Sequence, residues 1–398
     1  MQDQASVEYP EIKLKRGKDQ SIQRKHPWIF SGAIQNDISK ISDGELVQIT
    51  DFDGKFLGIG MFQFGSISIK ILSFHKQIID LNFFRDKISK CLEFRKNLNL
   101  FNNPNTNVFR LVFGEADGLP GLIIDYYNGH CVIQCHSIGM HLQLNHIQTA
   151  LKEVLKENVK SIYDKSKEAL PNSYAEKIEN RILEGNETHT LVTENNHQFF
   201  VDWEKGQKTG FFIDQRENRM LLSQFTKDKS VLNTFSYTGG FSVYAGASGA
   251  KKITSVDISA PAISIAEKNS TLNNLTNHEA VTADVFDYLK SHAHEYDVII
   301  LDPPAFAKNK SSKHNAVIGY KRLNAIAMKK IKPGGILFTF SCSQVIDKSL
   351  FFHTLSSAAF EANRSIKIIQ QLHQPPDHPI SLSYPEGEYL KGYIFQVE

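Results

Sequence analysis

The second half of the chain alternates apolar runs with segments of helical period. Strand-like runs lie at 230–235, 252–256, 279–282, 298–301 and 336–340. Helical segments lie near 240–247, 260–272 and 316–331. Apolar strands that alternate with helices are typical of βαβ units around a parallel sheet that helices cover on both faces. The pattern predicts a doubly wound α/β domain over residues 191–398.

The first 190 residues follow a different pattern. Short apolar runs separated by the turn signals Asp43-Gly44, Asp53-Gly54 and Phe64-Gly65 predict a small β-rich domain over residues 1–72. These runs lie at 46–50, 56–61 and 66–72. Residues 73–190 mix helical spacing with further strand-like runs and predict a second domain, with a surface loop at 165–180. The helical segments are 81–98 and 140–155, and the strand-like runs are 109–113, 122–126, 131–136 and 159–163.

Composition indicates a folded protein without a membrane span. The chain has 398 residues, of which 41% are hydrophobic and 22% charged, enough for two or three domains with their own cores. No apolar run approaches the ~20 residues that cross a bilayer, and the N-terminus has no apolar signal core. We therefore expect a cytoplasmic location. The formal charge of +2 means that any binding of nucleic acid must come from local patches.

The cysteines are too few and too irregularly spaced for a disulfide framework. They lie at positions 91, 131, 135 and 342. Cys131 and Cys135 neighbour His130 and His136, which raises the alternative of a zinc site. The spacing is not C-x-x-C, however, and no second pair follows. The apolar residues between the two thiols favour a buried strand, and no metal is expected.

One local patch of positive charge lies near the N-terminus. Six basic residues with only Asp19 opposing them precede the segment His26-Pro27-Trp28-Ile29-Phe30. The basic residues are Lys13, Lys15, Arg16, Lys18, Arg24 and Lys25. Such a stretch suits a nucleic-acid surface, because cations track phosphates and rings stack on bases. A solvated charge run before a core tryptophan fits the residue types equally well.

Ligands of doubly wound sheets bind at the carboxyl ends of the strands, so the residues after each strand indicate the chemistry. After the first strand comes the glycine-containing turn 235–241, FSYTGGF, and after the second comes Asp257, 18 residues beyond Gly239. An acid at about that distance can bind the ribose hydroxyls of an adenosine cofactor, either NAD or S-adenosylmethionine. Asp284, after the third strand, is suitably placed for the adenine amino group.

The fourth and fifth strands end in residues that favour S-adenosylmethionine. The fourth ends in Asp302-Pro303-Pro304-Ala305-Phe306, where two prolines fix the backbone so that a carboxylate and a ring face one pocket. This arrangement suits a planar base held against a methyl group, although a structural turn is the alternative. The fifth strand ends at Cys342, where a nucleophile would lie.

Seven segments together resemble the S-adenosylmethionine-dependent 5-methylcytosine RNA methyltransferases, specifically the bacterial large-subunit rRNA enzymes with an N-terminal PUA domain. They are KHPWIFSGAI at 25–34, GEADGLPGLIID at 114–125, KTGFFIDQREN at 208–218, FSYTGGF at 235–241, DPPAF at 302–306, TFSCS at 339–343 and YPEGEYLKGY at 384–393. The resemblance implies a PUA barrel at 1–72, a central α/β domain at 73–190 and a class I, Rossmann-like methyltransferase domain at 191–398. It also implies unassembled large-subunit rRNA as the partner, and is compatible with a homodimer.

The resemblance assigns roles to individual residues. Cys342 would add to carbon 6 of cytosine, and Asp302 would hold the ring. Residues expected to bind S-adenosylmethionine are Phe235, Tyr237, Thr238, Gly239, Gly240, Asp257, Asp284, Asp302, Gln215 and Arg216. Residues expected to contact RNA are Lys15, Arg16, Arg24, Lys25, Trp28, Pro303, Pro304, Phe306 and Lys308.

One departure and two alternatives accompany this interpretation. Many RNA cytosine methyltransferases carry a second cysteine directly after the Pro-Pro, where this chain has Ala305, so product release must use another group or solvent. The first alternative is an amino-nitrogen methyltransferase, since Asp-Pro-Pro-x-Phe resembles the segment of those enzymes. The second is a non-catalytic RNA-binding or ribosome-assembly factor.

Overall fold

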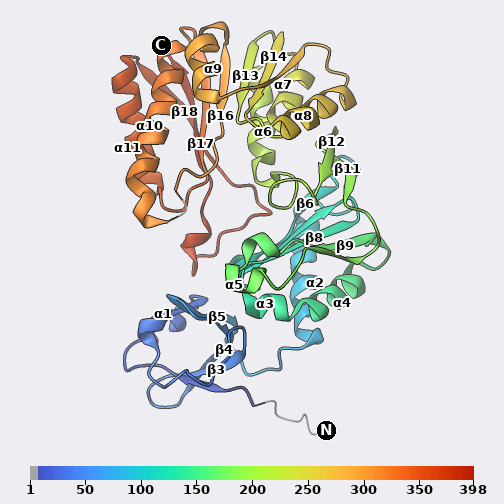
Figure 1. The fold of residues 1–398 in the computed structure, drawn as a ribbon, viewed down its shortest axis with the longest axis vertical. Helices are drawn as coiled ribbons and strands as arrows, with labels where there is room; N and C mark the ends of the chain where they lie inside the picture. Colours follow the sequence, from blue (N-terminus) through green and yellow to red (C-terminus); the bar gives the residue numbers. More distant parts are fainter. Residues whose placement is uncertain (1–7, 308) are drawn as a thin grey trace. The chain divides into compact units, whose positions relative to one another are not determined.

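The computed structural model describes residues 8–307 and 309–398 (Figure 1) and divides into two compact units. The first unit contains the chain up to Thr190 together with Asp202–Gly210 and Pro376–Gly387. The second contains Leu191–Val201, Phe211–Pro375 and Glu388–Glu398. Two short stretches of the C-terminal half therefore belong to the first unit. No described helix combines the length and the apolar character needed to cross a membrane.

The first unit begins with a five-stranded sheet in the order β1-β3-β4-β5-β2. The strands are β1 (Glu11–Lys13), β2 (Trp28–Phe30), β3 (Leu46–Thr50), β4 (Phe56–Phe62) and β5 (Ile67–Ser73). Their inward side chains, among them Ile12, Val47 and Ile69, form a core that Ile22 of α1 (Gln20–Gln23) joins. The three predicted strands are confirmed as β3, β4 and β5.

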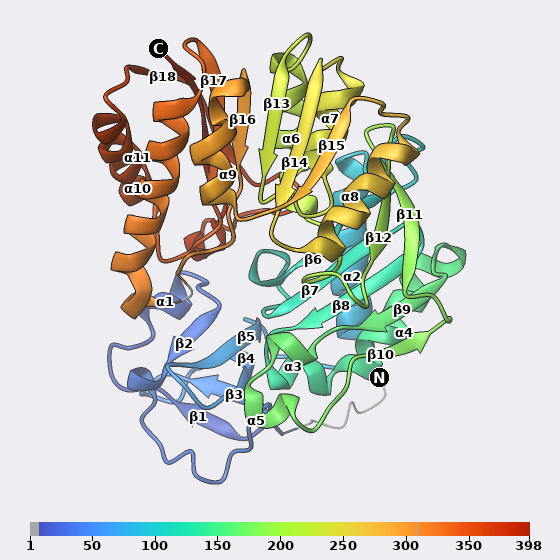
Figure 2. The same ribbon diagram turned by 45° about the horizontal axis from the view of Figure 1, so that its top comes forward.

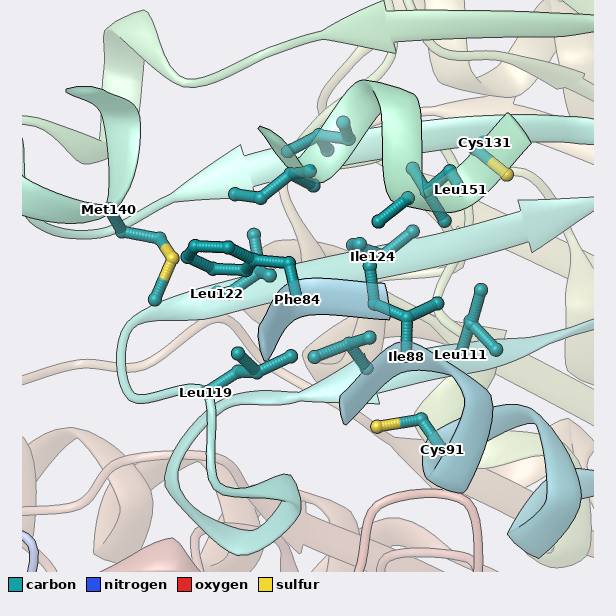
Figure 3. Close-up of a cluster of buried hydrophobic side chains, with 14 of the residues drawn as sticks. Phe84, Ile88, Cys91, Leu111, Leu119, Leu122, Ile124, Cys131, Met140 and Leu151 are labelled. Atoms are coloured by element: carbon teal, nitrogen blue, oxygen red, sulfur yellow. The ribbon is translucent and has the colours of Figure 1, made fainter. Parts of the chain in front are cut away.

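A second five-stranded sheet in this unit has the order β10-β9-β8-β7-β6. Its strands are β6 (Val108–Phe113), β7 (Leu122–Tyr127), β8 (His130–Cys135), β9 (Ser161–Asp164) and β10 (Arg181–Glu184). Phe84 and Ile88 of α2 (Leu81–Asn97) pack on Leu122 and Ile124 of β7, and Leu151 of α4 (Leu144–Leu155) joins this cluster (Figure 3). Cys131 and Cys135 are buried in β8, as the strand prediction requires.

Two predictions for this sheet's helical layer need correction. The expected helix at 140–155 is two helices, α3 (Ile138–Leu142) and α4, which meet at Gln143. The stretch 165–180 is more than a surface loop, since it contains the helical turns η4 (Lys167–Ala169) and α5 (Asn172–Ala175). Leu170 and Ala175 are buried against Ile138 of α3, so apolar contacts within a polar segment give it its structure.

The second unit contains a seven-stranded sheet in the order β15-β14-β13-β16-β17-β19-β18. The strands are β13 (Ser230–Thr234), β14 (Lys252–Asp257), β15 (His278–Thr282), β16 (Val298–Leu301), β17 (Gly335–Ser341), β18 (Ile366–His373) and β19 (Lys391–Val397). All neighbouring pairs from β15 to β17 are parallel, whereas β19 is antiparallel to both β17 and β18. Figure 2 shows β13, β14 and β15 side by side. The five predicted strands are confirmed.

Helices cover both faces of this sheet, and alternation along β16 shows how. Ile299 and Leu301 point into a core with the helices α9 (Val285–His292), α10 (Lys313–Lys330) and α11 (Lys348–Ala362). Val298 and Ile300 point into a second core with α6 (Arg216–Leu222) and α7 (Gly240–Ala247). The predicted doubly wound α/β fold is thus confirmed. The predicted helices correspond to α7, α8 (Ala260–Leu272) and α10.

Candidate active site

The carboxyl ends of the parallel strands bring the predicted site segments to one edge of the sheet. Thr234 of β13 pairs with Val256 of β14 and with Leu301 of β16, and Leu301 pairs with Thr339 of β17. The turn after β13, Asp257, Asp302 and Cys342 therefore emerge together, at the edge where ligands bind in such sheets.

The turn after β13 holds its backbone in an unusual conformation. Phe235 (φ 51°) and Tyr237 (φ 47°) lie in the left-handed region, which costs a residue with a side chain about 1–2 kcal/mol. Gly239 (φ 77°) completes the turn into α7, and an added Cβ there would lie 3.0 Å from Ala266 Cβ. The Ser236 hydroxyl is buried and has no hydrogen-bond partner among the described residues. Strain and an unsatisfied hydroxyl at a strand end are typical of a ligand site.

Asp257 fixes this turn while keeping acceptor capacity. Its Oδ2 accepts a hydrogen bond from the Tyr237 N–H (2.9 Å), and its Oδ1 accepts one from the Ser259 N–H (2.9 Å). Each carboxylate oxygen can accept a second bond, as the two ribose hydroxyls would require. Ile258 follows with 74% exposure, an apolar surface beside the acid that the sequence analysis did not single out. The sequence contained a signal for Ile258, namely an apolar residue directly after the acid at the end of a strand.

Other predicted cofactor residues have structural partners in the second unit. The Asn269 amide donates to the Thr238 carbonyl (2.8 Å). Asp284 is exposed and caps α9, where its Oδ1 accepts from the Asp287 N–H (3.1 Å). Arg216 is buried, with its Nε 3.2 Å from Glu217 Oε1.

A buried ion pair supports the segment that leads into the site. Arg219 donates to both carboxylate oxygens of Glu194 (2.8 and 2.7 Å), and its Nη1 donates to the Phe212 carbonyl (2.9 Å). An added Cβ on Gly240 would lie 3.1 Å from Arg219 Cδ, so the glycine lets this guanidinium approach the turn. The ring of Phe212 meets that of Tyr237 edge-on at 5.1 Å. The ion pair thus connects the start of α6 with the turn after β13.

Gln215 contacts the predicted catalytic acid. Its Nε2 donates to Asp302 Oδ2 (3.0 Å), and its own Oε1 accepts from the Asn218 amide (2.6 Å). Asn218 also donates to the His373 carbonyl (3.2 Å), which anchors this chain of amides to the end of β18. Because Gln215 is buried, this geometry makes it an orienting group for the Asp302 carboxylate.

The Cys342 thiol lies beside the Asp-Pro-Pro segment. Cys342 is half-buried, and its Sγ is 4.0 Å from the Pro303 carbonyl oxygen. Phe306 packs on Tyr320 of α10, with 4.6 Å between ring centroids. The structure therefore brings together the thiol, the acid segment and an aromatic ring that were predicted from two separate strand ends.

Two further residues near the thiol escaped the sequence analysis. Lys391, the first residue of β19, is buried, and its Nζ donates to the Ser343 carbonyl (2.7 Å). The hydroxyl of Tyr320 is buried without a hydrogen-bond partner among residues 8–307 and 309–398. Burial raises the pKa of Tyr320, the nearby Ser341 side chain opposes this shift, and the charges of Cys342 and Asp302 add to it. Lys391 lies within the segment YPEGEYLKGY, whose resemblance carried no role for it.

The predicted RNA residues of the first unit differ in exposure. Lys15, Arg16, Arg24 and Lys25 are all exposed. Trp28 is half-buried: its indole N–H donates to Glu115 Oε1 (2.9 Å), and the Tyr384 ring packs on it at 4.8 Å. Contacts within the first unit thus occupy part of this ring.

The remaining predicted RNA residues follow β16 in the second unit. Pro304 is exposed, Phe306 is half-buried, and Pro303 is buried with its carbonyl toward Cys342. Lys308 lies outside the described residues.

The fold and this site define a class of protein. The order β15-β14-β13-β16-β17-β19-β18, with β19 antiparallel and a glycine turn and acids at the carboxyl edge, is a Rossmann-like methyltransferase arrangement. Two solved structures share the fold over 98% of this chain and 100% of theirs: a Streptococcus mutans protein (TM-score 0.83, 23% identity) and SMU.776 complexed with SAH (TM-score 0.84, 24% identity).

Sequence comparison identifies the family. The profile of the S-adenosylmethionine-dependent methyltransferases matches residues 118–391, and that of PUA-like domains matches residues 12–74. Ribosomal RNA large subunit methyltransferase I of Pseudoalteromonas translucida (strain TAC 125) is 40% identical, covering 97% of this chain and 99% of the relative. The enzyme of that name from Salmonella typhi is 36% identical, covering 100% of both. The chain belongs to the S-adenosylmethionine-dependent methyltransferase family, and its relatives are named ribosomal RNA large subunit methyltransferase I. This confirms the resemblance to large-subunit rRNA methyltransferases with an N-terminal PUA-like domain.

Proposed function

We propose that the protein transfers a methyl group from S-adenosylmethionine to carbon 5 of a cytosine in large-subunit rRNA. The relatives that cover nearly the whole chain are named for methylation of large-subunit rRNA. The observation that carries the choice of carbon 5 is the Cys342 thiol beside Asp302-Pro303, at the carboxyl edge of the sheet. Transfer to an amino nitrogen needs no thiol, whereas carbon 5 of cytosine is a poor nucleophile until a thiolate adds to carbon 6.

The residues at the end of β13 and β14 fit the cofactor. Asp257 would accept bonds from the ribose hydroxyls, Ile258 would cover one face of the adenine, and the exposed Asp284 would accept from its amino group. The unsatisfied Ser236 hydroxyl and the N–H groups of the turn offer polar contacts to the rest of the molecule. Bound there, S-adenosylmethionine supplies an electrophilic methyl group.

Cys342 performs the covalent steps on the cytosine. Its thiolate forms a bond to carbon 6, and the electron pair of the carbon 5–carbon 6 double bond moves toward carbon 5, which becomes nucleophilic. After methylation, a base removes the proton from carbon 5, the double bond forms again and the sulfur leaves carbon 6 as thiolate. Ala305 leaves no second cysteine after the prolines, so solvent or another group accepts this proton.

Asp302 positions the pyrimidine while this charge moves. Gln215 fixes Asp302 Oδ2, so the carboxyl is oriented before the base enters. A carboxyl in this position can hold N3 and the exocyclic amine of cytosine and stabilise the charge that develops in the ring. Phe306 and the rigid Pro303-Pro304 pair would line the pocket that receives the cytosine.

The first unit would bind the RNA. Its PUA-like segment exposes Lys15, Arg16, Arg24 and Lys25, whose charges suit phosphates. The target atom is inaccessible in a stacked helix, so the cytosine must be flipped out or unpaired, as in rRNA that is not yet assembled. The three domains at 1–72, 73–190 and 191–398, the cytoplasmic location and the homodimer stay predictions.

A covalent trap tests this proposal. With rRNA in which 5-fluorocytidine replaces cytidine, methyl transfer should leave Cys342 bonded to carbon 6, because fluorine cannot leave carbon 5 as a proton does. We expect a protein–RNA complex that survives denaturation and requires S-adenosylmethionine. Cys342→Ala should abolish it.

Bisulfite sequencing of the product RNA should then show one protected cytosine. Methyl transfer without the adduct, and with a methylated amino group, would establish the amino-nitrogen alternative. Failure to bind S-adenosylmethionine in calorimetry would establish a non-catalytic RNA-binding protein.

A further inference from the structure

A lysine distant in sequence enters the turn that carries Cys342. In the antiparallel pair of β17 and β19, Lys391 lies opposite Ser341, the residue before Cys342. The Lys391 side chain is 4% exposed, and its Nζ donates to the carbonyl of Ser343, the residue after Cys342 (2.7 Å). The ammonium group is therefore fixed on the backbone of the residue that follows Cys342.

This buried cation forms no ion pair with a carboxylate among the described residues. The two acids that act on it electrostatically have other partners. Glu388 pairs with Lys348 at 2.5 Å, and Asp347 caps α11 by accepting from the Leu350 N–H (2.8 Å). A buried charge without a counter-charge is unfavourable, so an anion next to Lys391 would be strongly favoured.

Cys342 is the group that can supply that anion. Burial lowers the pKa of Lys391 to about 8, and among the charges that oppose this shift Cys342 acts most strongly, ahead of Glu388 and Asp347, while Lys348 adds to the lowering. At pH 7 the lysine is still largely protonated. A thiolate and an ammonium that lie close together stabilise each other.

We propose that Lys391 is the cation that stabilises the thiolate form of Cys342, acting as a positioning residue for the nucleophile. This rests on the proposed function only in assigning Cys342 as the nucleophile. The geometry that supports it is the Lys391–Ser343 hydrogen bond and the β17–β19 register. An ordinary thiol, with a pKa of about 8.5, is mostly protonated at neutral pH, whereas a neighbouring lysine can lower this value below about 7.5.

The pH dependence of alkylation by iodoacetamide tests the proposal on the full, folded chain. The other three cysteines are at most 3% exposed, so native alkylation reports on Cys342, and Cys342→Ala gives the background. We expect a wild-type midpoint below about 7.5. Lys391→Met should raise it by about 1 to 2 pH units and slow alkylation at pH 6 by about 10- to 100-fold. Lys391→Arg should keep it near the wild-type value.

Lys290→Met is the matched control, because it removes an exposed lysine of the same unit that pairs with Asp287 and is not among the charges that act on Lys391. This variant should leave the midpoint unchanged. Circular dichroism and the melting temperature establish that each variant is folded. An unchanged midpoint in folded Lys391→Met, or an equal rise in folded Lys391→Arg, overturns the proposal. The assay contains no RNA, so a failure of the proposed function, seen as methyl transfer by Cys342→Ala, is a separate result.

Discussion

The thiols of the two units have the same chemistry and different surroundings. Cys91, Cys131 and Cys135 of the first unit are buried, and burial raises the pKa of Cys91 and of Cys131 to about 12. Cys342 of the second unit is half-buried at the end of a parallel strand, and the Lys391 ammonium is fixed on the carbonyl of the residue that follows it. The comparison teaches that the exposure of a cysteine at a strand end and the charges around it decide whether its thiol can react.

Removing one thiol from each unit gives the largest expected contrast. Cys342→Ala should lower methyl transfer to rRNA by a factor on the order of 10³ or more, because the covalent route is lost. Cys131→Ala should keep the activity and lower the free energy of unfolding by on the order of 1 kcal/mol. Radiolabelled S-adenosylmethionine and urea denaturation measure the two effects. Equal activities of the two variants would show that the thiols do not differ in function.

The second-largest expected effect on activity comes from a change beside Asp302. Gln215→Leu removes the hydrogen bond to Asp302 at similar side-chain volume, and we expect kcat/KM to fall on the order of 10²-fold because the carboxyl loses its orientation. A merely structural role would change stability and leave the pH profile of kcat/KM alone, whereas an orienting role should change that profile as well. Gln198→Leu, on an exposed position of the same unit, is the control. Wild-type activity in Gln215→Leu would contradict the assigned role.

The fold was predictable where burial gives a simple pattern. The strands β13, β14, β16 and β17 are largely apolar because helices cover both faces of the sheet. The edge strand β15 is only partly buried, and it too could be located from the sequence. The strands β1 and β2 contain only three residues each, too few for a period to emerge. Most of β18 is exposed at the edge of its sheet, so its burial leaves little pattern in the sequence.

The site was predictable as far as strand ends determine it. The rule that ligands bind at carboxyl ends selected Asp257, Asp302 and Cys342, which do share one edge. It could not select Lys391, since this residue reaches Ser343 across 48 positions through the antiparallel pairing of β19. Likewise, the bond between Gln215 and Asp302 depends on packing between α6 and the sheet, which no local spacing encodes.

A histidine at the start of the edge strand β15, away from the candidate site, tests the effect of burial on stability alone. His278 is the first residue of β15, and its ring nitrogens contact the hydroxyls of Ser255 and Ser270 (both 2.8 Å). Burial lowers its pKa to about 4, compared with about 6.5 in an unfolded chain. The unfolded state therefore binds the proton more readily, and stability is lost as the pH falls from 7 toward 4.

Allowing for partial exposure, we expect His278 to contribute about 1 kcal/mol of that loss between pH 7 and pH 5. His278→Gln removes the titrating group, so the difference between the two proteins in urea denaturation isolates this contribution. Methyl transfer, measured as initial velocity at saturating substrate, should be similar in both at pH 7. The same loss of stability in wild type and variant would exclude His278 as its source.

The smallest expected effect is a difference in stability between variants of two buried tyrosines of the second unit. Like the thiols, these tyrosines have the same chemistry and different surroundings. The Tyr296 hydroxyl bonds to Thr254 Oγ1 (2.9 Å) and to the Tyr288 hydroxyl (3.0 Å), so Tyr296→Phe should lower the free energy of unfolding by about 1–2 kcal/mol. The Tyr320 hydroxyl is buried without a partner among the described residues, so Tyr320→Phe should leave that free energy within about 1 kcal/mol, at or above the wild-type value. Denaturant titration compares the two. If both variants lost equal stability, the Tyr320 hydroxyl would have a partner in solution, such as an ordered water. A loss of activity in Tyr320→Phe could then no longer be separated from a loss of stability.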